Sequence, residues 1–409
     1  MPPTPPAPSA DSQEETAVAA TPGESGASAQ SAAEVSQVGT AEAQAQAPVP
    51  AEAQAQTEAQ AQAQADATAA AAETAVEAEA AHAIATANEA ARHHPSFHSI
   101  VRKITPLKGH VVVVGSSNID YVVDVKRMPR LGETVKGGPL RVFPGGKSGN
   151  QAVAAALVGA PVSLVAAVGD DENGNLLLKH LRESHVNVSH VQRVEKPTST
   201  ALITVDANGD NTIVSSAGSN DEVNVNMVEV AGELIGNASL LGLALEMPLD
   251  AAVRAVEIAH DHSTMVVLNP SPMPSVLPGE LLDHADVLIL NEGELVALVG
   301  EDLQDWDDAA AKLRNLGVAR AIVTLGAQGS MVLDNGAVAI DAPTVQAVDT
   351  TGCGDAFMGA ILAALGNDAS LVEAAHFGSY VAAYAAEGHG AQASYGTLRE
   401  IEQRFSTTS

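Results

Sequence analysis

Residues 348–357 read Val348-Asp349-Thr350-Thr351-Gly352-Cys353-Gly354-Asp355-Ala356-Phe357, a glycine-rich turn that leads into an apolar stretch. Its glycines allow the amides of Gly352, Cys353 and Gly354 to converge on one point at a helix start. Converging amides and the positive end of a helix bind phosphate, so the turn predicts an anion hole. Asp355, in the first turn, can accept a proton from a hydroxyl near that phosphate. A simple helix-capping aspartate would give the same local pattern.

Two further segments carry polar groups next to glycines. The valine run 111–114 and the small residues after it predict a buried strand with Asn118 and Asp120 at its carboxyl end. In open α/β sheets, ligands bind at that edge. Residues 143–151 then place a double glycine, a lysine and an amide directly before an alanine-rich helix. These groups can donate to sugar hydroxyls, although Gly and Asn before a helix also occur as caps.

Apolar runs alternate with helical patterns through the rest of the chain. The runs are 162–168, 238–245, 265–269, 287–291 and 321–325, and the helical stretches between them include 176–184, 249–259 and 306–316. This alternation predicts an α/β domain with a parallel sheet and helices on both faces. One insertion differs, because Asn208-Gly209 between two short strand-like runs predicts a β-hairpin.

The first 108 residues differ in composition from the remainder. They are built mainly from Ala, Gln, Glu, Ser and Pro, and no aromatic residue precedes Phe97. Such a segment buries too little apolar surface to offset its ordering entropy, so we expect a disordered tail at 1–108 and a folded domain at 109–409. The tail lacks the basic start and apolar core of a secretory signal, and its acidity argues against a transit peptide.

Charge, hydropathy and cysteine content limit the classes of partner and the cellular compartment that we expect. The formal net charge of −30 disfavours nucleic acid as a partner. No apolar run reaches the roughly 18 residues of a membrane span, so we expect a soluble chain. The single cysteine excludes an internal disulfide and suits a reducing cytoplasm.

Together, the run Gly145 to Gln151 and the run Asp349 to Asp355 resemble the two signatures of the ribokinase-like (PfkB-type) carbohydrate kinases. The resemblance extends from about Gly109 to the C-terminus. It implies a three-layer α/β/α domain with a central, mostly parallel sheet and a small β-sheet lid, formed by about 121–142 and 200–216. It also implies a homodimer through that lid and ATP-dependent phosphorylation of D-ribose at its 5-hydroxyl.

The resemblance assigns site residues as well. Asp355 would be the catalytic base, beside the anion hole of Gly352, Cys353 and Gly354. Sugar-binding positions would be Asn118, Asp120, Gly145, Gly146, Lys147, Asn150, Glu246 and Asp355. ATP would contact Asn291, Thr324, Gly326, Gly329 and Gly354, and Glu294 would hold Mg²⁺ through water. An activating K⁺ would lie at Asp349, Thr351, Ala385, Gly388, Gly390 and Ser394.

Three positions depart from the family pattern, among them Ala393, which stands where a proline is common. Cys353 stands where alanine is more usual, and a thiol at a helix N-terminus can have a lowered pKa, although a small buried residue replacing alanine is the simpler interpretation. Gly388 stands where a longer side chain is common. Other hypotheses stay open: a kinase acting on deoxyribose, another sugar or a nucleoside, or a sugar sensor or scaffold without catalysis.

Overall fold

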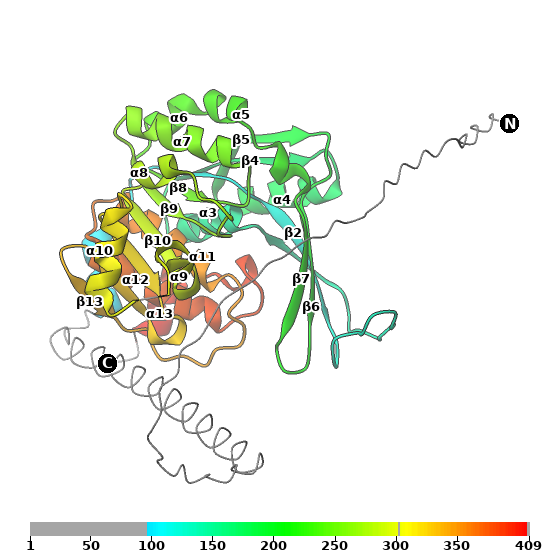
Figure 1. The fold of residues 1–409 in the computed structure, drawn as a ribbon. Coiled ribbons are helices and arrows are strands. Elements are labelled where there is room, and N and C mark those ends of the chain that lie inside the picture. The colour runs from blue at the N-terminus through cyan, green and yellow to red at the C-terminus, as the bar shows by residue number, and fades with distance from the viewer. Residues whose placement is uncertain (1–95, 302, 407–409) are drawn as a thin grey trace, which may run out of the picture. The chain divides into compact units, whose positions relative to one another are not determined.

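A computed structural model describes residues 96–301 and 303–406 (Figure 1). The disorder predicted for residues 1–95 lies outside this part of the chain. Within the described residues, no helix is long and apolar enough to cross a membrane.

A nine-stranded sheet forms the centre of the domain. Its strands lie in the order β13-β12-β11-β10-β9-β8-β1-β4-β5. All neighbours from β5 to β11 are parallel, and only β12 and β13 at one edge are antiparallel. The strands are β1 (Val111–Val114), β4 (Val162–Gly169), β5 (Val186–Val194), β8 (Leu240–Ala244), β9 (Met265–Asn269), β10 (Val287–Asn291), β11 (Ala321–Thr324), β12 (Ser330–Leu333) and β13 (Ala337–Ile340).

Helices cover both faces of this sheet. Side chains alternate along a strand, and in β1 Val111 and Val113 join one hydrophobic cluster while Val112 and Val114 join the other. One cluster holds residues of α2 (Phe97–Ile104), α3 (Lys147–Leu157), α11 (Cys353–Leu365), α12 (Leu371–Ala386) and α13 (Leu398–Phe405). The other holds residues of α5 (Val225–Val230), α6 (Gly232–Gly236), α7 (Leu249–Asp261), α8 (Gly279–Asp283), α9 (Glu292–Val299) and α10 (Trp306–Asn315). The predicted three-layer fold with a mostly parallel sheet is confirmed.

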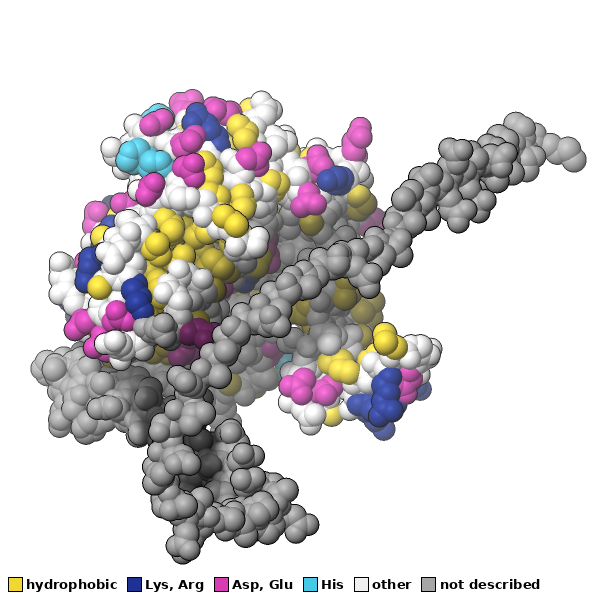
Figure 2. Space-filling view, viewed as in Figure 1, with side chains coloured by type: hydrophobic (Ala, Val, Ile, Leu, Met, Phe, Trp, Pro, Cys, Tyr) yellow, Lys and Arg dark blue, Asp and Glu magenta, His cyan; other side chains and the backbone are white. Residues whose placement is uncertain are grey.

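A second, four-stranded sheet forms the lid. Its order is β3-β2-β6-β7, from β2 (Asn118–Asp124), β3 (Arg141–Gly145), β6 (Thr200–Val205) and β7 (Asn211–Ser216). The hairpin predicted at Asn208-Gly209 is present, since β6 and β7 pair antiparallel across it. In Figure 1 these two strands extend away from the main sheet, and in Figure 2 Lys and Arg side chains gather toward the far end of the lid. Asn118 and Asp120 belong to β2 of this lid rather than to the end of the central strand β1.

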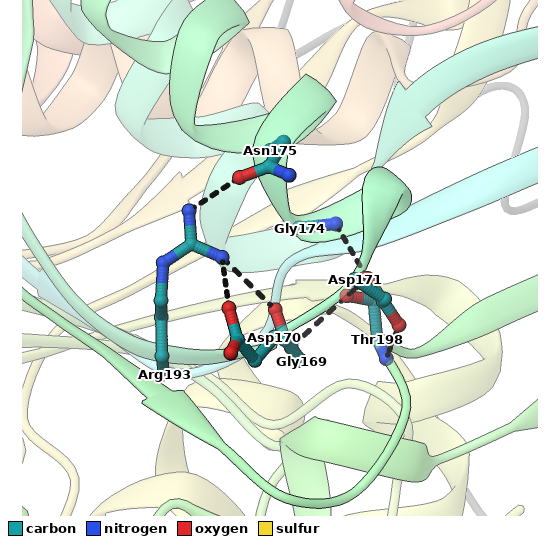
Figure 3. Close-up of polar contacts among 7 residues, drawn as sticks. All are labelled: Gly169, Asp170, Asp171, Gly174, Asn175, Arg193 and Thr198. Atoms are coloured by element: carbon teal, nitrogen blue, oxygen red, sulfur yellow. Dashed lines mark hydrogen bonds and ion pairs between the residues drawn. The ribbon is translucent and has the colours of Figure 1, made fainter.

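Hydrogen bonds at the end of β4 anchor the lid hairpin (Figure 3). Asp171 caps α4 (Glu172–Glu183) by accepting the Gly174 amide at 2.8 Å, and it also accepts the Thr198 amide at 2.8 Å. The Thr198 hydroxyl donates to Asp171 and accepts the amide of Gly169 at 2.9 Å. Thr198 lies two residues before β6, so the base of the hairpin is fixed to the main sheet.

The segment just before β1 corrects one prediction. Residues 96–108 were expected to belong to a disordered tail, yet Phe97–Ile104 forms helix α2 with Phe97, Ile100, Val101 and Ile104 buried. The Phe97 ring stacks on Phe377 of α12 with centroids 5.8 Å apart. The spacing i, i+3, i+4, i+7 is that of an amphipathic helix, which the neighbouring low-complexity composition concealed. The folded domain therefore begins no later than Ser96. Deleting residues 1–105 would remove α2 and its buried side chains from the core.

Candidate active site

The glycine-rich turn begins helix α11. Gly352 is its N-cap residue, with a left-handed φ of 77°. A Cβ atom added there would lie 2.5 Å from Cβ of Ala391, so the turn depends on glycine for both conformation and space. The Tyr395 hydroxyl donates to the Gly352 carbonyl at 2.8 Å and ties the turn to the C-terminal segment. The sequence therefore placed the turn at the helix start correctly.

Asp355 lies in the first turn of α11 and is only 9% exposed. Its Oδ2 accepts a hydrogen bond from Nδ2 of Asn150 at 2.8 Å, and its Oδ1 accepts one from Nε2 of Gln151 at 3.2 Å. Burial raises the pKa of the Asp355 carboxyl, while the Lys147 charge and the two amides act in the opposite direction. A raised pKa makes a carboxylate a better proton acceptor, provided that it stays ionised at the working pH.

Three elements bring further polar groups to the start of α3. Asn118 of the lid donates from Nδ2 to Oδ1 of Asp120 at 2.6 Å. Oε2 of Glu246, which follows β8, accepts the Lys147 amide at 2.9 Å and the Ser116 hydroxyl at 2.7 Å. Gly146 is the N-cap of α3, and Gly145 is the last residue of β3. The predicted sugar-binding residues thus come from the lid, the start of α3, the segment after β8 and the start of α11.

The charges in this group are unbalanced. Burial raises the pKa of Asp120 to about 6; the Asn118 hydrogen bond opposes the rise, and the charges of Glu246 and Asp355 add to it. Three carboxylates therefore act on one another, and the charge of Lys147 acts on Asp355 in the opposite direction. Hydroxyl groups of a ligand can donate to these oxygens, whereas an anionic ligand would add to the repulsion. The group is suited to a neutral polyhydroxyl compound.

Two cavities adjoin each other next to Asp355. The larger, of about 640 Å³, is lined by all five predicted ATP-contacting residues and by apolar side chains that include Val345, Phe357 and Ala382. The smaller, of about 150 Å³, is lined by Lys147, Glu294, Gly352, Asp355 and others. Asn291, Thr324 and Gly354 line both cavities. The large, mostly apolar cavity therefore meets the smaller one beside Gly354, and the smaller one is lined by the buried Asp355.

Asn291 and Glu294 also form a capping box at the start of α9. The Asn291 side chain accepts the Glu294 amide at 2.8 Å, and the Glu294 carboxylate accepts the Asn291 amide at 2.9 Å. This exchange satisfies two amides that the helix itself leaves unpaired. The Asn-x-x-Glu spacing therefore has a structural role in addition to any role in binding.

The six predicted cation-site residues lie in one neighbourhood. Asp349 accepts the amide of Thr351 at 2.9 Å and that of Gly390 at 2.8 Å. Burial disfavours the Asp349 anion, but these hydrogen bonds outweigh it and lower the pKa of the carboxyl. Gly388 packs on Ser394, since an added Cβ would lie 2.7 Å from that of Ser394, and its amide bonds to the carbonyl of Ala385. Glycine at 388 therefore follows from close packing.

The thiol of Cys353 differs from the sequence-based hypothesis. Burial raises its pKa to about 11, and the charges of Asp349 and Asp355 add to the rise. The lowered pKa suggested by the helix N-terminus is therefore wrong, because two nearby carboxylates and desolvation outweigh the helix dipole. Cys353 therefore fits the simpler interpretation, a small residue that replaces alanine in the turn.

Four residues near the site were not predicted to belong to it. Gln151, Gln392, Ser116 and Tyr395 each hydrogen-bond to a predicted site residue. Gln151 stands inside the Gly145 to Gln151 motif, so a signal for it was present. Nothing in the local sequence around Ser116 or Tyr395 indicates their partners.

A glycine turn and a buried carboxylate between two groups of binding residues are expected of an enzyme that transfers phosphoryl groups. Residues 108–398 match the model of the pfkB family carbohydrate kinases, and the chain belongs to this family of kinases. The family expected from the sequence motifs is therefore confirmed.

Individual relatives agree with this assignment. The ribokinase of Staphylococcus aureus is 35% identical over 300 residues, which cover 72% of this chain and 98% of that protein. The deoxyribokinase of Salmonella typhi is 31% identical over 301 residues, covering 72% and 98%. The structure of Arabidopsis thaliana ribokinase complexed with ribose and ATP superposes with a TM-score of 0.69 at 30% identity, covering 74% of this chain and all of that one.

The two glycines of the turn allow a matched test. An added Cβ at Gly354 meets no atom within 4 Å, whereas one at Gly352 overlaps Ala391. Gly352→Ala should lower the free energy of unfolding by at least about 1–2 kcal/mol, from the left-handed backbone alone. Gly354→Ala should keep the melting temperature but raise the KM for ATP about tenfold or more, because its methyl would enter the space shared by both cavities. Equal stability of the two variants in thermal unfolding would refute this account of the turn.

Proposed function

We propose that this kinase transfers the γ-phosphoryl group of ATP to the 5-hydroxyl of D-ribose, giving D-ribose 5-phosphate and ADP. The observation that carries the proposal is the position of Asp355. It lines the small cavity that continues the larger one, and it is hydrogen-bonded to Asn150 of the Gly-Gly-Lys motif helix. The likeness to a ribokinase complexed with ribose and ATP supports this choice of substrates.

The sugar would lie between the lid and α3. Asn118, Asp120, Glu246 and Asn150 would bind its hydroxyls, together with Lys147 and the backbone of Gly145 and Gly146. Three carboxylates close to one lysine favour a neutral ligand that donates several hydrogen bonds. A pentose with free hydroxyls meets this requirement.

The chemical step would use groups on both sides of the glycine turn. The 5-oxygen of ribose attacks the γ-phosphorus, and the bond from that phosphorus to the ADP oxygen breaks. The hydroxyl proton passes to Asp355, which later releases it to solvent. The amides of Gly352, Cys353 and Gly354 would stabilise the negative charge on the transferred group, and Lys147 would partly neutralise it.

ATP would occupy the larger cavity, in contact with Asn291, Thr324, Gly326, Gly329 and Gly354. Glu294 fits a role in holding Mg²⁺ through water, because this residue lines the small cavity together with Asp355. The ion would supply positive charge to the phosphates. Full activity in excess chelator would contradict this assignment.

A K⁺ site in the neighbourhood of Asp349 and Gly390 is also part of the proposal. The group offers one carboxylate with a lowered pKa and several backbone carbonyls, and hard cations prefer oxygen ligands. Residues Thr351, Ala385, Gly388 and Ser394 would complete it. If kcat were the same with K⁺ as with a bulky organic cation in its place, the proposed K⁺ site would be wrong.

We further propose a cytoplasmic homodimer that forms through the lid. Leu140, Leu202, Ile213 and Val214 of the lid region are exposed apolar side chains, which an interface would cover. A monomeric mass in light scattering would contradict the dimer. Activity recovered only outside the cytoplasm on fractionation would contradict the location.

Deoxyribose is the second candidate acceptor, because a deoxyribokinase is among the relatives. Another sugar or a nucleoside would use the same chemistry. A non-catalytic sensor is disfavoured, since Asp355 and the glycine turn are intact. A coupled ADP-release assay against pentoses, hexoses and nucleosides separates these possibilities, and a nucleoside or hexose preferred over ribose by about tenfold would overturn the ribose assignment.

Replacing the base tests the chemical role. Asp355→Asn keeps the shape of the side chain but replaces one of its two acceptor oxygens with an NH₂ group, and it cannot accept the hydroxyl proton. We expect kcat with D-ribose to fall roughly 10²-fold or more while ATP still binds. Steady-state kinetics and ATP titration measure both quantities. A variant with near-wild-type kcat would exclude Asp355 as the base.

Asp120 gives a pH-dependent test of sugar binding. With a pKa of about 6, it becomes protonated as the pH falls through that value and loses an acceptor for a sugar hydroxyl. The KM for ribose should therefore rise below pH 6, and Asp120→Asn should have a KM raised about tenfold or more that varies little with pH. The matched control is Asp124→Asn, an exposed acid further along β2. A KM for ribose that does not change with pH in the wild-type enzyme would contradict the role of Asp120.

The wild-type enzyme should also prefer ribose over 2-deoxyribose by at least about tenfold in kcat/KM.

A further inference from the structure

The orientation of the Asn150 side-chain amide determines whether a hydrogen-bond donor or an acceptor faces the carboxylate of Asp355. Asn150 presents its NH₂ group to Oδ2 of Asp355 at 2.8 Å. A flip of that amide would present its carbonyl oxygen to the carboxylate instead, and two acceptors would then face each other. Some other group must therefore hold the amide in one orientation.

Gln392 provides this restraint. It lies in the short 3-10 helix η3 (Gln392–Ser394) and is 4% exposed. Its Nε2 donates to Oδ1 of Asn150 at 2.8 Å and approaches the Gly145 carbonyl at 3.5 Å. Because Oδ1 of Asn150 accepts from Gln392, its Nδ2 is directed to Asp355.

The carbonyl end of the Gln392 amide is buried without a hydrogen-bond partner, and the Gln392 side chain acts electrostatically on the ring of His180. Oε1 of Gln392 and Nε2 of His180, in α4, are both buried and have no hydrogen-bond partner among the described residues. They are complementary, since a ring N–H donates and an amide oxygen accepts. Burial lowers the pKa of His180, so the ring is neutral at pH 7, while Gln392 acts on the ring in the opposite direction. A neutral ring with its proton on Nε2 can donate to Gln392.

We propose that His180 and Gln392 are positioning residues for the reaction, which orient Asn150 toward Asp355 without touching the substrates. The Gln392 amide donates to Asn150, and the Asn150 amide donates to Asp355. The His180 ring N–H would extend this series by donating to the Gln392 carbonyl. The four residues come from α4, η3, α3 and α11, which are far apart in sequence. The inference rests on the proposed role of Asp355 as the base.

The expected consequence is a change in the pH dependence of kcat. The Asn150 hydrogen bond lowers the pKa of Asp355, so loss of its alignment raises that pKa and moves the acidic limb of the profile to higher pH. Other groups that act electrostatically on Asp355, or are acted on by it, are Lys147, Glu246, Asp120, Cys353 and Tyr395, and Glu183 acts on His180. None of these is changed in the variants below.

The test compares Gln392→Leu, His180→Phe and His180→Gln in the full-length chain, assayed with D-ribose and Mg-ATP across pH. We expect Gln392→Leu to lower kcat at pH 7 about tenfold or more, and His180→Phe about threefold, both with the acidic limb at higher pH. His180→Gln should keep wild-type values because its amide N–H replaces the ring N–H. The KM for ATP should not change in any of them.

His284→Phe is the matched control, because Nδ1 of His284 is likewise buried without a partner, between α8 and β10. It should leave the pH profile unaltered. Unaltered profiles in both Gln392→Leu and His180→Phe would overturn the inference. A loss in His180→Gln equal to that in His180→Phe would also overturn it, since packing alone would then explain the effect.

Two further results separate the possible failures. If Gln392→Leu has a lowered melting temperature, the two His180 variants decide the question by themselves. If Asp355→Asn is inactive while the positioning variants match wild type, only this inference fails. If Asp355→Asn keeps its activity, the proposed base is wrong and the positioning role is lost with it.

Discussion

The negative charge of Asp355, buried at the start of α11, is the constraint on which the rest of the site depends. A buried carboxylate is costly unless nearby charges and hydrogen-bond donors compensate for it. Here the compensation comes from the amides of Asn150 and Gln151 and from the charge of Lys147. All three belong to the first turns of α3. The two signature segments of the chain are therefore one structural unit, although more than 200 residues separate Gln151 from Asp355.

Small residues make this unit possible. An added Cβ at Gly359 of α11 would lie 2.5 Å from the carbonyl oxygen of Gln151 and 2.6 Å from Cβ of Ala154, so the two helices approach closely. Close approach of their axes lets short amide side chains on one helix reach a carboxylate on the other. The parallel sheet beneath is buried on both faces and fixes where these helices begin. The same packing leaves room beside α12 for the larger cavity, which Ser379, Ala382 and Ala386 line.

Much of this arrangement is predictable from the sequence because it depends on local patterns. Glycine followed by an apolar helix predicts the turn before Asp355, and Asn208-Gly209 predicts the lid hairpin. Contacts between distant segments are not predictable in this way. Ser116 reaches Glu246 across 130 residues, and Gln392 reaches Asn150 across 242. Helix α2 was missed for a different reason, since its apolar spacing directly follows a long stretch of low complexity.

The pKa shifts of the site residues could not be predicted from local sequence patterns either. A thiol at a helix N-terminus suggests a lowered pKa, but Cys353 has a raised one because burial and two carboxylates act on it. Which of these effects is larger depends on distances that only the folded chain defines. The pKa of Asp120 is raised for a similar reason, through burial and the nearby Glu246 and Asp355.

The most direct test of the account is a ¹³C NMR titration of the Asp355 side-chain carboxyl, identified by its absence from the spectrum of Asp355→Asn. Burial predicts that this carboxyl titrates at a higher pH than an exposed aspartate, and at a still higher pH in Asn150→Leu, which lacks one compensating donor. A titration at or below the ordinary aspartate value of 3.8, unaffected by Asn150→Leu, would contradict the account.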